Sequence, residues 1–276
     1  MIVLKCQLSD RKIKGQFRKL IFAKRIFCPR CGYTKIRVSE NRYRCPKCRK
    51  PFSLISGTWL KDMKISWSKL YLILDCWLKG IDLKNVCYLV KVSYPTAFLW
   101  YRKFRLNVPK EAFKLSKNGY YLVDESYFGW KRKGNRGRGC QGRKPVFGIY
   151  DPLTGFALSE TVLDVSEETL ISIIQKSVPL NSTVVSDGWR SYWGLSEKGY
   201  QHIIIDHEKN FKGTNCIESC WSHQKRNLRK MYHHCWLENL PEYVRESTYR
   251  FCARKNPDSP LSYLQKSISL VPNPLH

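Results

Sequence analysis

Two apolar, strand-like segments of this sequence each lead into an aspartate, and they constrain the fold more than any other feature. YYLVDESYFG (120–129) carries Asp124, and STVVSDGWRSY (182–192) carries Asp187. Hydrophobic runs of this length, bounded by glycine and polar residues, are typical of strands. We therefore expect neighbouring strands of one sheet to bring the two carboxylates together.

A third acid, Glu218, lies near the start of a predicted helix over 214–234. Asn215 can cap this helix, and the segment contains neither glycine nor proline. Glu218 shares one helix face with Lys225, and an acid in such a place is usually a solvated surface residue. The two upstream aspartates favour another interpretation, a carboxylate trio able to hold divalent metal. The apolar stripe of the helix comprises Ile217, Trp221, Leu228 and Tyr232.

The element pattern between 118 and 256 predicts the fold class. Three strands in meander order are followed by a helix, a strand, a short helix, a strand and a final helix. This is the order of an α+β, ribonuclease H-like core, a mixed five-stranded sheet with helices. The strand segments are 120–129, 144–151, 155–165, 182–187 and 202–206, and the helical segments begin near 166, 189 and 214.

The clearest local motif is a pair of Cys-X-X-Cys knuckles separated by thirteen residues. Both have the form Cys-Pro-basic-Cys, which makes a chance occurrence a poor explanation. Two such turns can present four thiolates to one tetrahedral zinc ion, with a short hairpin between them. We expect a zinc ribbon over 20–56, held together by one structural zinc. Its ligands are Cys28, Cys31, Cys45 and Cys48.

Residues 57–110 are predicted to be mainly helical, after a linker at 51–63. Ser66, Asp82 and Ser93 each precede a helical pattern and can act as N-caps. Three short helices in succession are typical of a helix-turn-helix DNA reader, although a plain helical hairpin that fills space is the alternative. The position of these helices directly after a basic zinc ribbon favours the DNA-binding interpretation.

The charge of the chain indicates a polyanionic partner. It has 49 Lys and Arg against 22 Asp and Glu, a formal net charge of +27. Such an excess is costly through self-repulsion unless nucleic acid or another polyanion binds it. No apolar run is long enough to span a bilayer, and no signal peptide is recognisable, so we expect a cytoplasmic, nucleoid-associated protein without membrane contact. A Gly/Arg-rich loop at 131–144 can contact a phosphate backbone or remain a solvated hairpin loop.

The motifs VDESYFG, KPVFGIYD, STVVSDGWRSY and TNCIESCWSHQKRNLRKMYHH, with the DH of IIIDHEKNF, resemble those of DDE-type insertion-sequence transposases. Among these, the resemblance is to the group with an N-terminal zinc ribbon (ISXO2-like, Merlin-related). It covers about 20–255 and keeps the order and spacing of the motifs. One departure is Asp206-His207, where an Asn would be expected before the His.

The resemblance implies a catalytic domain over 118–256 that binds terminal inverted repeats and performs Mg²⁺-dependent strand cleavage and transfer. Carried over by motif, the catalytic residues are Asp124, Asp187, Glu218 and Lys225. The three acids would bind two Mg²⁺ ions, for which Mn²⁺ can substitute. The expected partners are double-stranded DNA, at the repeats and the target, and a homodimer or higher oligomer in the DNA complex. Alternatives are a domesticated zinc-ribbon DNA-binding regulator, a structure-selective nuclease on the same fold, and a zinc-ribbon RNA-binding or translation module.

Overall fold

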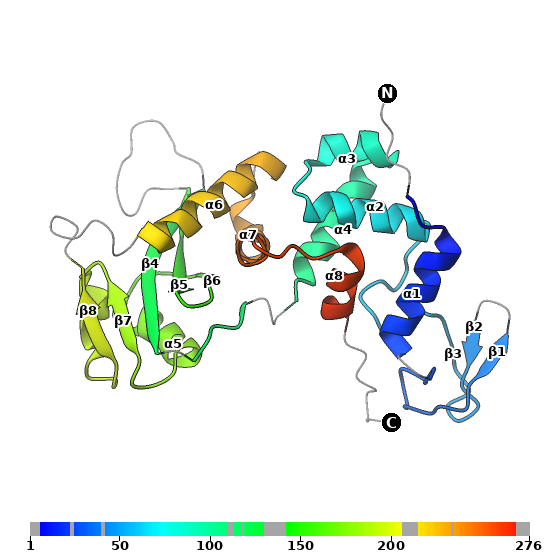
Figure 1. Cartoon of the computed structure of the whole chain (residues 1–276), viewed down its shortest axis with the longest axis horizontal. Helices are drawn as coiled ribbons and strands as arrows, with labels where there is room; N and C mark the ends of the chain where they lie inside the picture. The colour runs from blue at the N-terminus through cyan, green and yellow to red at the C-terminus, as the bar shows by residue number, and fades with distance from the viewer. Residues whose placement is uncertain are drawn as a thin grey trace. The chain divides into compact units, whose positions relative to one another are not determined.

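A computed structural model describes residues 6–22, 25–39, 42–109, 113–117, 119–129, 142–205, 215–232 and 235–268, and the chain forms two compact units (Figure 1). The first unit combines 1–109 with 258–276, and the second spans 110–257. The segment after 257, for which the sequence alone predicts no structure, therefore belongs with the N-terminal part of the chain.

The ribbon of the first unit is a small three-stranded antiparallel sheet. Strands β1 (Arg37–Ser39) and β2 (Arg42–Arg44) form the predicted hairpin. β3 (Pro51–Phe52) pairs with β2, so the expectation that a linker begins at 51 is wrong at its first two residues. Tyr43 stands opposite Phe52, their ring centroids 5.3 Å apart, and this aromatic contact adds the third strand.

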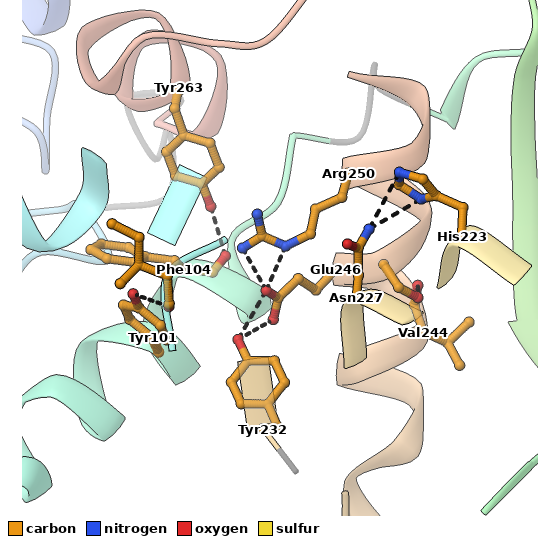
Figure 2. A network of polar contacts seen from close by, with 11 residues as sticks. Tyr101, Phe104, His223, Asn227, Tyr232, Val244, Glu246, Arg250 and Tyr263 are labelled. Atoms are coloured by element: carbon orange, nitrogen blue, oxygen red, sulfur yellow. Dashed lines mark hydrogen bonds and ion pairs between the residues drawn. The ribbon is translucent and has the colours of Figure 1, made fainter. Parts of the chain in front are cut away.

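Helices make up the rest of the first unit. Ser66 and Asp82 accept hydrogen bonds from the third backbone N–H beyond them, which fixes the start of two helices as predicted. The C-terminal helix packs on this group, where Tyr263 Oη donates to the carbonyl oxygen of Phe104 at 2.6 Å (Figure 2). The helices are α1 (Asp10–Phe22), α2 (Trp67–Leu78), α3 (Leu83–Val90), α4 (Tyr94–Leu106) and α8 (Pro260–Ser267).

A mixed five-stranded sheet organises the second unit. Its strand order is β6-β5-β4-β7-β8, in which β4, β5 and β6 are antiparallel neighbours and β7 and β8 run parallel to β4. The predicted ribonuclease H-like arrangement is thereby confirmed. The strands are β4 (Tyr120–Gly129), β5 (Arg143–Asp151), β6 (Phe156–Thr161), β7 (Thr183–Ser186) and β8 (Gln201–Ile204).

Helices cover both faces of this sheet (Figure 1). Along β4, Leu122 and Phe128 join the core made with α6 and α7, whereas Tyr121 and Val123 join the core made with α5. This alternation follows from the two-residue period of a strand, and it turns Asp124 toward α6. The helical segments are α5 (Glu167–Ser177), η2 (Arg190–Leu195), α6 (Asn215–Tyr232), η3 (Leu237–Asn239) and α7 (Leu240–Cys252). Over the residues described, the structure has no helix with the length and apolarity needed to cross a membrane.

Candidate active site

The register of the central strands aligns the two predicted aspartates. Leu122 of β4 pairs with Val185 of β7, and the same offset two residues further places Asp124 level with Asp187. Asp187 directly follows β7, where its Oδ1 accepts a hydrogen bond from the backbone N–H of Trp189 at 3.1 Å. Gly188 between them has a φ of 79°, a backbone conformation that favours glycine and lets the chain turn at once.

Glu218 reaches this region from α6, which packs on β4 and β5. It lies in the first turn of the helix, where the N-terminal end of the helix dipole favours a negative charge. Asp187 and Glu218 each raise the pKa of Asp124 by charge repulsion, as expected for three carboxylates that share one site. Across the described residues, potential ligands meet as a compact group only at the four cysteines, so the carboxylates form a more open arrangement.

The environment of Asp124 disfavours its charged form. Desolvation by burial raises its pKa to about 6 from an ordinary value of 3.8. Trp221, on the helix turn after Glu218, donates its indole N–H to Asp124 Oδ2 at 2.8 Å, which acts in the opposite direction and lowers the pKa. A partly buried carboxylate within the electrostatic influence of two others is a suitable place for a cation.

Lys225 lies further along α6 and faces the same strand. Its Nζ donates to Ser126 Oγ at 2.7 Å and stands 5.2 Å from the centroid of the Phe128 ring. Because side chains two apart on a strand share a face, Asp124, Ser126 and Phe128 form one row below α6. The ammonium group is thus held on the sheet surface that carries the carboxylate, within reach of an anion bound there.

The sequence analysis did not identify two long-range hydrogen bonds of β4, of which the one from Trp221 supports the site. Trp221 was assigned only to the apolar stripe of α6, yet its indole N–H binds the predicted catalytic Asp124. On the opposite sheet face, the hydroxyl of the buried Tyr192 donates to Glu125 Oε1 at 2.7 Å. An available signal was Gly148 in the middle of a strand pattern, since an isolated strand glycine often marks close approach by another group.

A second support fixes α6 against α7 (Figure 2). The carboxylate of Glu246 accepts from the hydroxyl of Tyr232 at 2.7 and 2.9 Å, and from Arg250 Nη2 at 2.7 Å. The side chains of Glu246 and Arg250 are only 1% and 8% exposed, so this is a buried ion pair. Tyr232 is the last residue of α6, so its hydrogen bond holds the C-terminal end of this helix. Glu218 lies in the first turn, at the other end of the same helix.

The four predicted zinc ligands form a compact cluster in the first unit. Their sulfur atoms lie within 4.8 Å of one another, with 3.7 Å between Cys28 and Cys48 and 3.6 Å between Cys31 and Cys45. A tetrahedral site with Zn–S bonds of about 2.3 Å has S–S edges of about 3.8 Å, so the spacing fits. Burial raises the pKa of the Cys28 thiol to about 12, and a bound cation would offset that cost of ionisation.

Two features singled out in the sequence lie outside the described residues. One is the Asp206-His207 pair. The other is most of the Gly/Arg-rich loop at 131–144, of which Gly142, Arg143 and Lys144 are described. The last two residues open β5.

A family model and two curated proteins match this chain. A family model described as an ISXO2-like transposase domain matches residues 118–252. An "uncharacterized protein in transposable element ISH50" of Halobacterium salinarum is 22% identical over 274 aligned positions, which cover 89% of this chain and 92% of that protein. An "uncharacterized transposase-like protein" of Haemophilus influenzae is 33% identical over 94 positions, 33% of this chain and 76% of that protein.

Solved structures also match about half of the chain at low identity. The integrase catalytic core domain of HTLV-2, in complex with magnesium, is 11% identical with a TM-score of 0.33, over 49% of this chain and 86% of that one. The catalytic core domain of BIV integrase is 11% identical with a TM-score of 0.33, over 51% of this chain and 90% of that one.

Proposed function

We propose that this chain, which belongs to the family of ISXO2-like transposases, cuts and joins DNA at the terminal inverted repeats of an insertion sequence through Asp124, Asp187 and Glu218. The observation that carries the proposal is that Asp124 lies on β4 and Asp187 directly after β7, the parallel neighbour of β4, while the helix that bears Glu218 packs on β4. Each of the three side chains offers carboxylate oxygens, the ligands that Mg²⁺ and Mn²⁺ prefer.

Two divalent ions held by these acids would activate the attacking oxygen and stabilise the leaving oxygen of the phosphodiester. The residues of the chain supply position and charge. Asp124, Asp187 and Glu218 would supply the carboxylate oxygens that hold these ions. Lys225, held over Phe128 and Ser126, neutralises a phosphate on the same sheet face. Electrostatic positioning of this kind is the main resource for phosphoryl transfer, because little covalent chemistry is left to the protein.

The first unit would hold the DNA while the second unit cuts it. The cysteine cluster would bind one structural zinc, and the surrounding ribbon is strongly basic, with fifteen Lys and Arg between 11 and 50. The helices over 57–110 would serve as the helix-turn-helix-like reader of the repeat, and the domain from 118 to 256 would be catalytic. Phosphate contacts of this kind give binding that weakens steeply with salt.

The test is cleavage of a labelled DNA end by full-length protein. Sequencing the DNA on either side of the gene would supply the substrate, because a transposase gene lies between paired terminal inverted repeats. Asp124→Asn, Asp187→Asn and Glu218→Gln keep side-chain size while removing charge, so each should bind the end normally and cut it about a thousandfold more slowly. Wild-type cutting by any of the three would remove that residue from the site.

Glu125→Gln is the matched control. It removes a carboxylate next to Asp124 on the same strand, but on the sheet face where Tyr192 binds it. Cleavage should stay within about threefold of wild type, a change of less than 1 kcal/mol. Equal losses in Glu125→Gln and Asp124→Asn would indicate a general effect on folding and would contradict the assignment of roles.

A further inference from the structure

We propose that Trp221 is a positioning residue for Asp124, and that Gly148, which has no side chain, leaves the space that the Trp221 ring occupies. The inference rests on the proposed function, because it takes Asp124 as a metal ligand. The indole N–H donates to Asp124 Oδ2 at 2.8 Å, and the Trp221 side chain is only 5% exposed. A buried donor held to a single carboxylate oxygen fixes the orientation of that carboxylate.

The sheet is shaped to receive this ring. Gly148 of β5 is the direct cross-strand partner of Asp124. A methyl group added at Gly148 would lie 2.5 Å from Cη2 and 2.6 Å from Cζ2 of Trp221, well inside van der Waals contact. The backbone there is not in the left-handed region, so glycine is needed for space and not for its conformational freedom. The indole therefore occupies the position that a side chain beside Asp124 would fill.

The type of donor suits a cation site. A carboxylate on a strand has a broad, two-fold torsion and would rotate without a partner. An arginine or lysine donor would restrain it but would also repel a divalent ion, whereas an indole N–H is neutral and has no lone pair to compete for the ion. With Oδ2 held by Trp221, the orientation of the carboxylate is set, and Oδ1 has a fixed direction.

The arrangement couples two ligands to one helix. Trp221 follows Glu218 by three residues, so both lie on neighbouring faces of the first turns of α6. Phe128 packs edge-on against the indole with ring centroids 6.0 Å apart and keeps the ring in place. Docking of α6 on the sheet therefore brings in the third carboxylate and orients the first in a single step.

The test measures Mn²⁺ binding to the zinc-loaded full-length chain by titration calorimetry, alongside cleavage of the labelled DNA end. Trp221→Phe keeps an aromatic ring but removes the donor, and it should weaken Mn²⁺ binding about tenfold, as expected for loss of a ligand's hydrogen-bond partner. Gly148→Ala should weaken it comparably by displacing the ring. In the Trp221→Phe background, Gly148→Ala should add little, because the atoms that it meets are gone.

Trp193→Phe is the matched control, since Trp193 is 65% exposed in the same unit and should leave Mn²⁺ affinity unchanged. Wild-type Mn²⁺ affinity in folded Trp221→Phe, or full additivity with Gly148→Ala, would overturn the positioning role. If Trp221→Phe does not fold, Gly148→Ala alone decides, and unchanged affinity in that variant overturns the role. If Asp124→Asn binds Mn²⁺ and cuts DNA as wild type does, Asp124 is not a metal ligand, and the proposed function is contradicted. If Asp124→Asn loses both activities while Trp221→Phe keeps them, only the positioning role fails.

Discussion

The cysteine cluster and the proposed carboxylate site differ in how the fold assembles them. The four thiols come from two short turns within 21 residues, and their sulfur atoms lie within 4.8 Å of one another. The three acids are spread over 95 residues, from Asp124 to Glu218, and only strand register and helix docking can bring them together. The first site is local and compact, whereas the second, as proposed, depends on the packing of a whole domain. Four predictions test this difference.

The largest effect is expected at the local site. Cys45→Ser removes one of four ligands, and structural zinc contributes on the order of 10 kcal/mol to a ribbon of this size. The variant should lose its zinc, and the ribbon should unfold while the sheet of the second unit remains intact. Metal analysis should give about one zinc per chain for wild type and none for the variant. Stoichiometric zinc in Cys45→Ser would contradict the four-ligand site.

A smaller loss of stability is expected when the buried ion pair between Glu246 and Arg250 is broken. Glu246→Gln leaves Arg250 buried without its counter-ion and weakens the bond to Tyr232, which should lower the free energy of unfolding of the second unit by about 3–5 kcal/mol. Zinc content should not change, because the cluster lies in the other unit. Urea denaturation measures the loss, and Glu238→Gln, an exposed acid in η3 just before the same helix, is the control.

The charge on Asp124 is expected to cost stability while no divalent ion is bound. Its pKa is raised to about 6 from 3.8, so the stability linked to its neutral form is complete below about pH 4 and is lost as pH rises through 6. Asp124→Asn should therefore be more stable than wild type at pH 8, by up to about 3 kcal/mol, and nearly equal at pH 4. Denaturation at both pH values without Mg²⁺ measures this. A destabilised Asn variant at pH 8 would contradict it.

Lys225→Ala should have the mildest effect on the reaction. The lost ammonium weakens the position of a phosphate but removes no metal ligand, so we expect cleavage to slow about tenfold, or about 1.4 kcal/mol. Mn²⁺ affinity should stay at the wild-type value, which separates this residue from the carboxylates. Single-turnover cleavage measures the change, and Lys225→Arg should recover part of the rate because it keeps the charge.

The accuracy of the sequence analysis follows the same division. The cysteine spacing and the N-caps Ser66 and Asp82 are local signals, and the structure confirms the cluster and both helix starts. The order of strands also predicted the sheet, because chain connectivity leaves few alternatives. The contacts of Trp221 with Asp124 and of Tyr192 with Glu125 join residues 97 and 67 positions apart. No periodicity encodes such pairs, since they depend on how a helix is rotated on the sheet.

The return of α8 to the first unit affects how this protein is made. During synthesis the ribosome releases the ribbon and the first helices long before the segment from 260 to 267, and the whole five-stranded sheet emerges in between. The hydrogen bond from the hydroxyl of Tyr263 to the carbonyl oxygen of Phe104 cannot form until that segment has been translated. The second unit can therefore complete its fold before the first. A fragment that stops near residue 110 would resemble the nascent chain at that stage, with the Trp77 and Phe104 surface that packs on Tyr263 uncovered.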